Sequence, residues 1–340
     1  MSQITALSKP LVLITGATGA IGPRVVLALD HAGFRIRAFS VDIPATGMFP
    51  PHVGVLIGDI TDQVALQSAM RGVDAVVHMA ALLHILNPPA KMREKYERVN
   101  VGGTATVVET AIRAGVKRVV LFSTIAVYGQ ANGQMLNEYS PTHPDTFYAR
   151  TKLAAEQIVL NAKRKDRQPL GTVLRLSAVY GSRIKGNYER LTHALARHRF
   201  IPIGNGLNRR TLVYDKDVGR AAVLAISHPA AAGRVFNVTD GEFHTLNEII
   251  ESICSALGRK APWLSLHSGV IRSVAGAIAA GYHIFGLRSP ITPEMVDKYT
   301  EDSAVNGSLI QKELGFVPQY DLQAGWRETI GEMRRIGHLE

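Results

Sequence analysis

Hydrophobic positions in the first half of the chain fall in short runs, separated by longer stretches with helical periodicity. Leu11–Thr15 is almost continuously apolar, as expected of a strand covered by helices on both faces. Similar runs predict five further strands, at residues 35–41, 53–57, 74–78, 117–123 and 172–176. Helical patterns occupy residues 20–32, 91–114 and 148–165. The alternation of strands and helices predicts an α/β fold built on a parallel sheet.

The rhythm changes after residue 180, where loops rich in Gly and Asn separate more isolated helices. We therefore expect a first domain over residues 1–176 and a smaller carboxyl-terminal domain over residues 177–340. Residues 235–238 again read as a strand, so the first domain should receive a strand from within residues 211–240 or close by. The two domains should interleave.

Composition places the chain among ordinary globular proteins. Its 340 residues are 46% hydrophobic and 19% charged, which excludes a disordered or fibrous class. The one cysteine, Cys254, has no partner for an internal disulfide and lies on the apolar side of a helical pattern, so we expect a core residue. The first nine residues lack the pattern of a secretory signal, and we expect a cytoplasmic protein.

The charge balance is basic, with 38 Lys and Arg against 28 acids and a net charge of +10. The basic clusters at residues 163–165 and 197–199 are short and far apart, without a nucleic-acid-binding motif, so we expect no nucleic-acid partner. The positive charge favours a small anionic ligand or solubility. The 12 histidines show no metal-ligand spacing, and we expect no metal.

The longest apolar stretch, residues 270–287, is interrupted by Arg272 and His283. Its uncharged middle is shorter than the ~20 residues that span a bilayer. We therefore expect no membrane span. The stretch should form one buried helix, or a helix lying against a partner or a membrane surface.

A glycine motif, Gly16, Gly19 and Gly22, follows the first strand directly and opens a helix. A turn that brings the backbone close to a pyrophosphate needs residues without Cβ, and the helix start then binds the phosphates. The motif predicts a Rossmann-type, doubly wound sheet that binds a dinucleotide. The expected contacts are Gly16, Thr18, Gly19, Ala20, Ile21 and Gly22.

A second group of residues points to proton transfer. Tyr148 and Lys152 are four apart and share one face of a predicted helix. A phenol has a pKa near ~10, and a neighbouring ammonium lowers that pKa toward neutrality. Thr124, at the end of the fifth strand, adds a hydroxyl that could orient a substrate oxygen.

Together these residues resemble the extended short-chain dehydrogenase/reductases, in particular the NAD-dependent epimerase/dehydratase family, along essentially the whole chain. The resemblance rests on the glycine turn, Asp59-Ile60, residues 78–81, residues 99–104, Ser123-Thr124 and the Tyr148/Lys152 pair. It implies that Thr124, Tyr148 and Lys152 form the catalytic set. It also implies the remaining cofactor contacts, at Asp59, Ile60, Met79, Ala80, Ala81, Asn100, Ser123, Tyr148, Lys152 and Val179.

The second half is similar to the branch of this family that acts on nucleotide sugars. This resemblance implies that Asn187 and Arg210 approach the diphosphate of a UDP-sugar, and it suggests His84 as a residue that touches the sugar or packs in its loop. It also implies a homodimer through the helices at 91–114 and 148–165.

Two departures from the family pattern bear on the chemistry. The second strand ends at Ser40, where relatives that bind NAD carry an acid for the ribose hydroxyls. No arginine follows closely to bind an extra phosphate, although Arg37 lies on the same strand, so we favour NAD while leaving NADP open. Ile125 stands where dehydratases place an acid, which disfavours dehydration.

Three functions follow from these observations. The first is an NAD(P)-dependent enzyme acting at C4 of a UDP-sugar, as a 4-epimerase or a 4-ketoreductase of surface-polysaccharide synthesis. The second is a dehydrogenase for hydroxysteroids or other apolar alcohols, with the same catalytic residues. The third is a regulator that binds a dinucleotide without catalysis, although such a protein has no need of Tyr148 and Lys152.

Overall fold

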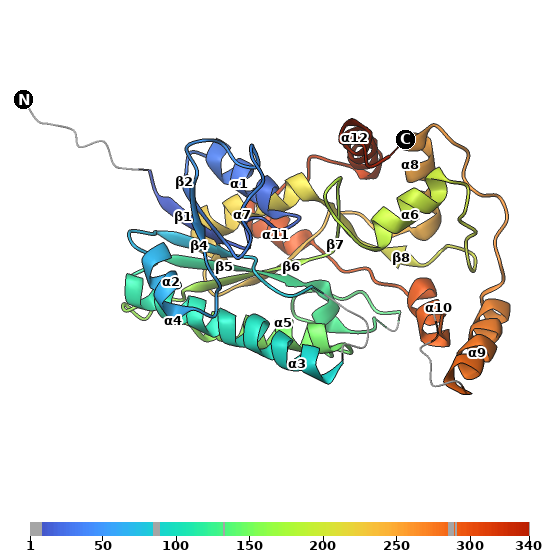
Figure 1. Ribbon diagram of the computed structural model, residues 1–340, viewed down its shortest axis with the longest axis horizontal. Helices are drawn as coiled ribbons and strands as arrows, with labels where there is room; N and C mark the ends of the chain where they lie inside the picture. The colour runs from blue at the N-terminus through green and yellow to red at the C-terminus, as the bar shows by residue number, and fades with distance from the viewer. Residues whose placement is uncertain (1–8, 84–88, 132, 285–288, 290, 340) are drawn as a thin grey trace, which may run out of the picture.

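A parallel sheet of seven strands forms the centre of the first domain (Figure 1). The computed structural model describes residues 9–83, 89–131, 133–284, 289 and 291–339. In sheet order the strands are β10 (Val235–Val238), β6 (Gly171–Leu176), β5 (Arg118–Thr124), β4 (Ala75–His78), β1 (Leu11–Thr15), β2 (Arg35–Ser40) and β3 (Gly54–Ile57). The chain order reverses between β1 and β4, where doubly wound sheets bind their ligands. The Rossmann-type fold expected from the sequence is confirmed.

Helices cover both faces of the sheet. The side chains of Val12 and Ile14 pack toward one face, and those of Leu11 and Leu13 toward the other, which explains the continuous apolar run of β1. The first face is covered by α1 (Gly22–His31), α7 (Asp215–Ser227) and α11 (Ser308–Leu314). The second face is covered by α2 (Gln63–Ala69), α4 (Thr104–Ala114) and α5 (Phe147–Asn161).

The helix expected at residues 91–114 is not uniform. It consists of α3 (Ala90–Tyr96), a π-helical segment (Glu97–Gly103) and α4. Gly103 lies against Ile60, and a Cβ at Gly103 would come within 2.5 Å of the Ile60 side chain. The wider π turn therefore lets this helix approach the end of β3, as π segments often do near functional sites.

The other expected helices shift at their ends. α1 begins at Gly22 rather than at residue 20, and α5 ends at Asn161 because Ala162 is extended and its carbonyl accepts the N–H of Leu170. The seven-residue α2, which the sequence pattern did not predict, begins where the Asp62 carboxylate accepts the N–H groups of Val64 and Ala65.

A second core lies in the carboxyl-terminal half. It forms around Trp326 of α12 (Leu322–Arg335), packed against α8 (Leu246–Leu257) and α6 (Asn187–Ala196). Tyr180 stacks on Trp326 with ring centroids 4.6 Å apart. Cys254 is 2% exposed within this core, as predicted. Two short sheets, β7 (Ala178–Tyr180) with β9 (Leu212–Tyr214) and β8 (Arg209–Arg210) with β11 (His244–Thr245), complete this half.

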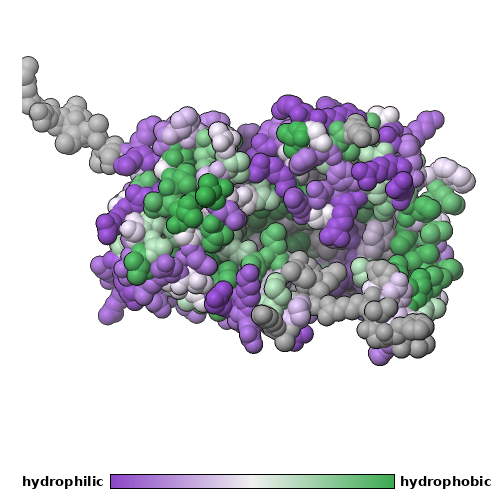
Figure 2. Space-filling model, in the orientation of Figure 1, coloured by the Kyte–Doolittle hydropathy of each residue, from purple (hydrophilic) through white to green (hydrophobic). Residues whose placement is uncertain are grey.

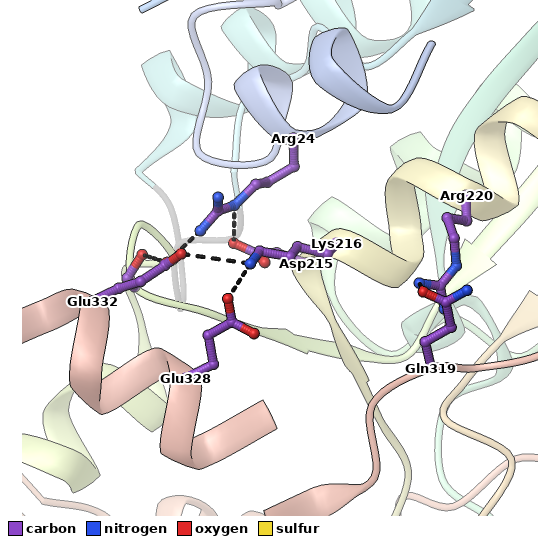
Figure 3. A network of polar contacts seen from close by, with 8 residues as sticks. Arg24, Asp215, Lys216, Arg220, Gln319, Glu328 and Glu332 are labelled. Atoms are coloured by element: carbon purple, nitrogen blue, oxygen red, sulfur yellow. Dashed lines mark hydrogen bonds and ion pairs between the residues drawn. The ribbon is translucent and has the colours of Figure 1, made fainter. Parts of the chain in front are cut away.

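A charged network joins the two halves (Figure 3). Arg24 of α1 donates to Asp215 at 3.2 Å and to Glu332 of α12, and Lys216 pairs with Glu328. Burial raises the pKa of Asp215 to about 6, although Arg24 opposes this shift. The network fixes α12 against the helices of the sheet, so the second core has a defined position beside the strand ends.

The apolar stretch near residue 270 forms α9 (Ser268–Ile284), followed by α10 (Pro293–Thr300). The expectation of a buried helix is wrong, because Val270 is 60% exposed and further apolar side chains of α9 face outward. Residues 285–288 lie outside the described part of the chain. Of the helices that the structure describes, none has both the length and the apolar character needed to cross a bilayer.

A buried ion pair attaches α5 to the sheet. Arg175 of β6 donates to Glu156 of α5 with Nε at 3.1 Å and Nη2 at 2.7 Å, and both side chains are almost fully buried. Ser123 at the end of β5 donates to the same carboxylate at 2.5 Å. A buried pair of this kind is costly to break from one side, because the remaining charge has no partner.

We expect Glu156→Ala to lower the free energy of unfolding by about 3–5 kcal/mol, because it leaves the Arg175 guanidinium buried without its partner. Urea denaturation measures this loss. Glu109→Ala, which breaks an exposed pair with Arg113 on α4, is the matched control and should cost less than about 1 kcal/mol. Equal losses in the two variants would contradict the assignment.

Candidate active site

The glycine turn between β1 and α1 lies at the carboxyl end of the sheet. Gly16 has φ +71°, and its N–H donates to the carbonyl of Phe39 at 2.8 Å. A Cβ at Gly16 would lie 2.8 Å from the backbone N and Cα of Ala80, and a Cβ at Gly22 would lie 2.0 Å from the carbonyl oxygen of Ala17. Side chains are therefore excluded at both positions.

The start of α1 is suited to an anion. Its N-cap residue, Ile21, provides no side chain to accept the N–H groups of the first turn. Pro23 has no N–H, and the N–H groups of Gly22 and Arg24 donate to the carbonyls of Gly19 and Ile21, so it is the positive end of the helix dipole that favours phosphate here. The residues present thus fit a dinucleotide pyrophosphate, with Thr18, Gly19 and Ala20 in the turn that leads to it.

Ser40 lies beside this turn, at the end of β2. Its buried hydroxyl accepts the N–H of Thr18 at 3.1 Å. Arg37, the basic residue on the same strand, donates to the carbonyls of Ala69 at 2.6 Å and Arg71 at 2.8 Å. Its guanidinium therefore holds the end of α2 and does not serve the cofactor turn. Asp42 is exposed in the loop beyond.

Asp59 and Ile60 follow β3 as the sequence predicts. The Asp59 carboxylate accepts the N–H of Thr61 at 2.9 Å and its hydroxyl at 3.0 Å, and so shapes its own loop. Ile60 is buried against Gly103. Asp59 and Ile60 therefore form a fixed surface at the end of β3, which lies two strands from β1 in the sheet.

A buried histidine connects the ends of β1, β4 and α4. His78 Nδ1 is 2.7 Å from the Thr15 hydroxyl, and its Nε2 is 3.0 Å from the Thr104 hydroxyl. Burial, with a contribution from the charge of Lys152, lowers the pKa of His78 to about 3. The ring is therefore neutral, and it fixes the strand end that continues into Met79, Ala80 and Ala81.

Asn100 connects the next loop to α5. Its Oδ1 accepts the N–H of Leu82 at 2.8 Å, and its Nδ2 donates to the Thr151 hydroxyl at 3.1 Å. Thr151 in turn donates to the carbonyl of Tyr148 at 2.8 Å. The side chain of Asn100 thus connects the loop after β4 to the turn of α5 that carries Tyr148 and Lys152.

Tyr148 and Lys152 lie in the first two turns of α5, which Thr146 caps by accepting the N–H of Ala149 at 3.1 Å. Lys152 is 4% exposed, and Tyr148 is half-buried. Burial lowers the pKa of Lys152 to about 8, an effect that Glu156 opposes. Burial also raises the pKa of Tyr148 to about 12, and Tyr96 raises it further. The expectation of a lowered phenol pKa is therefore wrong, because burial and Tyr96 determine the direction of the shift.

Thr124 ends β5 and caps the 3₁₀ turn Ile125–Tyr128 by accepting the N–H of Ala126 at 3.2 Å. Ile125, which follows Thr124, and Leu153, which follows Lys152, pack against the same small hydrophobic core. The structure thus brings the strand-end hydroxyl and the helix pair into one region. Val179, half-buried in β7, packs against the core of the first domain.

The residues expected to bind a diphosphate lie at the edge of the second domain. Asn187 is exposed at the start of α6, and Tyr188 follows it. Burial raises the pKa of Tyr188 to about 12, and the charge of Arg210 opposes this shift. Arg210 donates to the Ser303 hydroxyl at 3.1 Å and to the Tyr299 carbonyl at 2.8 Å. His84 lies outside the described residues.

An ion pair connects this edge to the segment just before α5. Lys298, whose carbonyl accepts from Arg210 at 3.2 Å, pairs with Asp145 at 3.2 Å. Asp145 precedes Tyr148 by three residues. Arg210 is therefore linked to the segment just before Tyr148 through Lys298 and Asp145.

The sequence interpretation missed the residues that surround and position Tyr148 and Lys152. These are Tyr96, Asn100 in its bracing role, Thr151, Glu156 and Arg175. One signal was available, since Glu156 follows Lys152 by four residues and so shares its helix face. The partners on other elements give no sequence signal.

Comparison with known proteins agrees with this geometry. Residues 12–239 match the model of the NAD dependent epimerase/dehydratase family. The N-acetyl-alpha-D-glucosaminyl-diphospho-ditrans,octacis-undecaprenol 4-epimerase of Escherichia coli O157:H7 is 27% identical over 322 residues, covering 94% of each chain. The 3 beta-hydroxysteroid dehydrogenase/Delta 5-->4-isomerase of Mycobacterium tuberculosis is 27% identical over 334 residues, covering 94% of this chain and 89% of that one.

Among solved structures, MoeE5 in complex with UDP-glucose and NAD is 26% identical, with a TM-score of 0.73 and coverage of 96% of this chain and 99% of that one. The family match extends over more than half of the sequence and includes the glycine turn, Thr124 and the Tyr148/Lys152 pair. The chain therefore belongs to the NAD-dependent epimerase/dehydratase family of enzymes.

Proposed function

We propose that this enzyme acts at C4 of a UDP-sugar, as a 4-epimerase or a 4-ketoreductase, with Thr124, Tyr148 and Lys152 as its catalytic residues. The observation that carries the proposal is the position of Tyr148 and buried Lys152 on one face of α5, next to the ends of β4 and β5. The relative from Escherichia coli, named as a 4-epimerase of a sugar diphosphate, supports reaction at C4.

Tyr148 exchanges the proton of the C4 hydroxyl in this mechanism. Its raised pKa of about 12 makes the neutral phenol the resting form, so the side chain is ready to donate a proton to a ketone oxygen. For oxidation the phenol must first lose its proton. Lys152, charged at neutral pH with a pKa of about 8, is the cation that stabilises the phenolate.

The remaining groups position the reactants. The Thr124 hydroxyl accepts one backbone N–H, and its own proton can be donated to the substrate oxygen. NAD, when bound, supplies the acceptor and the donor of hydride. The residues proposed to hold it are those of the glycine turn, Ser40, Asp59, Ile60, Met79 to Ala81, Asn100, Ser123, Lys152 and Val179.

We infer a preference for NAD over NADP. Ser40 provides no carboxylate for the ribose, but Arg37, the candidate for binding an extra phosphate, is committed to the carbonyls at the end of α2. A binding site for the 2′-phosphate would need a free guanidinium or ammonium at this position.

Arg210 and Asn187 are proposed to bind the diphosphate of the sugar nucleotide. Three N–H donors of Arg210 hold carbonyl and hydroxyl groups of the segment that ends α10. A guanidinium has five donors, so two are left for a ligand. Because its position is fixed by these bonds, Arg210 loses little freedom when it binds an anion.

A hydroxysteroid-type or other apolar-alcohol dehydrogenase is the second candidate. The relative from Mycobacterium tuberculosis matches nearly the whole chain, and α9 carries an exposed apolar face. Against it stands Arg210, since an apolar alcohol has no phosphate for a fixed guanidinium to bind. Dehydration is disfavoured, because Ile125 occupies the place of the acid that elimination requires.

Gly16→Ala should weaken NAD binding at least tenfold, because its Cβ would meet the Ala80 backbone at 2.8 Å and displace the cofactor turn. Isothermal titration with NAD measures this. Gly33→Ala is the control, since Gly33 shares a positive φ of +88° but has open space for a Cβ, and it should keep the wild-type affinity. Equal losses would mean that general strain, and not the turn, causes the effect.

Tyr148→Phe should retain NAD binding but lose about 10²- to 10⁴-fold in turnover, the usual contribution of a general acid–base group. Turnover is followed by NMR with UDP-glucose, UDP-N-acetylglucosamine and their 4-keto-6-deoxy derivatives, with and without NADH or NADPH. Tyr139→Phe, at an exposed tyrosine, should behave as wild type. Near-normal turnover of Tyr148→Phe would refute its catalytic role.

Arg210→Ala separates the two candidate substrate classes. We expect about 10- to 100-fold loss of kcat/KM with a UDP-sugar, since hydrogen bonds to a charged group are worth about 1.5–3 kcal/mol. Arg209→Ala, which removes the exposed neighbour paired with Asp302, should change kcat/KM little. A steroid alcohol oxidised equally well by wild type and Arg210→Ala would favour the second candidate.

A further inference from the structure

We infer that one end of the second domain docks on an anionic phospholipid membrane. The docking face, as we call it, combines an apolar part and a basic part. The apolar part consists of Trp263, Leu264, Val270, Val274 and Ile278, and the basic part of Arg190, His193, Arg197 and Arg199.

The apolar part is exposed although it is hydrophobic. Trp263 is 92% exposed, and Val270, Val274 and Ile278 follow one another at intervals of four along α9, so they lie on one side of the helix. Figure 2 shows hydrophobic residues gathered at the end of the molecule where α9 lies. Contiguous exposed apolar surface of this kind marks an interaction site.

The opposite side of α9 is the one that packs on the protein. Ala275 is fully buried, and Gly276 approaches Pro293 of α10. Arg272, the one Arg, Lys, Asp or Glu in the sequence of α9, pairs with Asp297 of α10 at 2.9 Å. The charge of this helix therefore points toward α10, and its outward side is left apolar.

The basic part lies on α6 from Arg190 onward and on the turn after it. Arg190, His193, Arg197 and Arg199 line one shallow depression. Of the carboxylates in the described residues, none lies within ion-pair distance of these four side chains. Their charge is therefore available to an external anion.

The two parts are neighbours in the fold. The N–H of Leu266 donates to the carbonyl of Pro202 at 2.9 Å, and the N–H of Gly204 donates to the carbonyl of Leu266 at 2.8 Å. The chain leaving α6 thus runs beside the chain that enters α9. Arg199 precedes the paired segment by three residues, and Val270 follows it by four.

An anionic bilayer satisfies both parts at once. Trp and Tyr prefer the interface between lipid and water, aliphatic side chains insert below it, and Arg binds lipid phosphates. The net charge of +10 adds long-range attraction to such a surface. A second copy related by a two-fold axis through the basic part would oppose one basic cluster to another, which makes that arrangement unfavourable, and a dimer through the apolar part alone would leave the basic part without an anion.

Cosedimentation of the full chain with vesicles tests the inference. We expect binding to phosphatidylcholine mixed with phosphatidylglycerol, and little binding to phosphatidylcholine alone. Two double variants, Val270→Glu/Val274→Glu and Arg197→Glu/Arg199→Glu, should each bind the anionic vesicles at least tenfold more weakly. Each basic residue near an anionic surface contributes roughly fivefold to the binding constant. The matched controls are Val64→Glu, at an exposed position of α2, and Lys165→Glu. Both should bind as wild type.

Tryptophan fluorescence gives a second readout that needs no variant. The chain has two tryptophans, and Trp326 is buried, so a blue shift on adding anionic vesicles reports Trp263 entering the lipid. Absence of both cosedimentation and blue shift would overturn the inference. The inference would also be overturned if the wild-type chain forms an oligomer in sedimentation velocity and Val270→Glu/Val274→Glu dissociates it. The docking face would then be covered by a second copy.

Discussion

The carboxylate of Glu156 is the group on which the placement of the reactive residues depends. It accepts hydrogen bonds from Arg175 of β6 and from Ser123 of β5, and it lies one helical turn beyond Lys152. The same charge therefore attaches α5 to the sheet and favours the protonated form of Lys152. The pair is tolerated in a buried position because the carboxylate accepts from both Nε and Nη2 of Arg175 and from Ser123, although Nη1 of Arg175 is buried without a hydrogen-bond partner among the described residues.

Around this anchor, neutral hydrogen-bonding groups set the remaining geometry. His78 joins three elements without carrying charge, and Asn100 connects the loop after β4 to the turn of α5 that holds Tyr148. Because these groups are uncharged, they add no field that opposes the ammonium of Lys152. The ends of the central strands are thus joined by hydrogen bonds, and the ion pair between Lys298 and Asp145 connects the segment before α5 to the segment whose carbonyls accept from Arg210.

Local sequence signals were sufficient to predict the sheet and to select Tyr148 and Lys152 as candidate catalytic residues. Strand β1 and the turn at Gly16 depend on side chains within a few positions of one another, and the Tyr148/Lys152 pair depends on one helical turn. The pKa of Tyr148 has no such local signal. It depends on burial and on Tyr96, which precedes Tyr148 by 52 residues. The sequence likewise left two alternatives for α9, a buried helix or one lying against a partner or a membrane surface, because an apolar helix can face a core or its surroundings.

The transfer of deuterium from C4 tests the account most directly. The protein is incubated with NAD and either UDP-glucose or UDP-N-acetylglucosamine deuterated at C4, and both the nicotinamide and the sugar are followed by mass spectrometry and NMR. The account predicts that deuterium leaves C4 for the nicotinamide ring, and in an epimerase returns to C4 of the opposite configuration. Deuterium that stays at C4 of both sugars, while a hydroxysteroid reduces NAD, would contradict it.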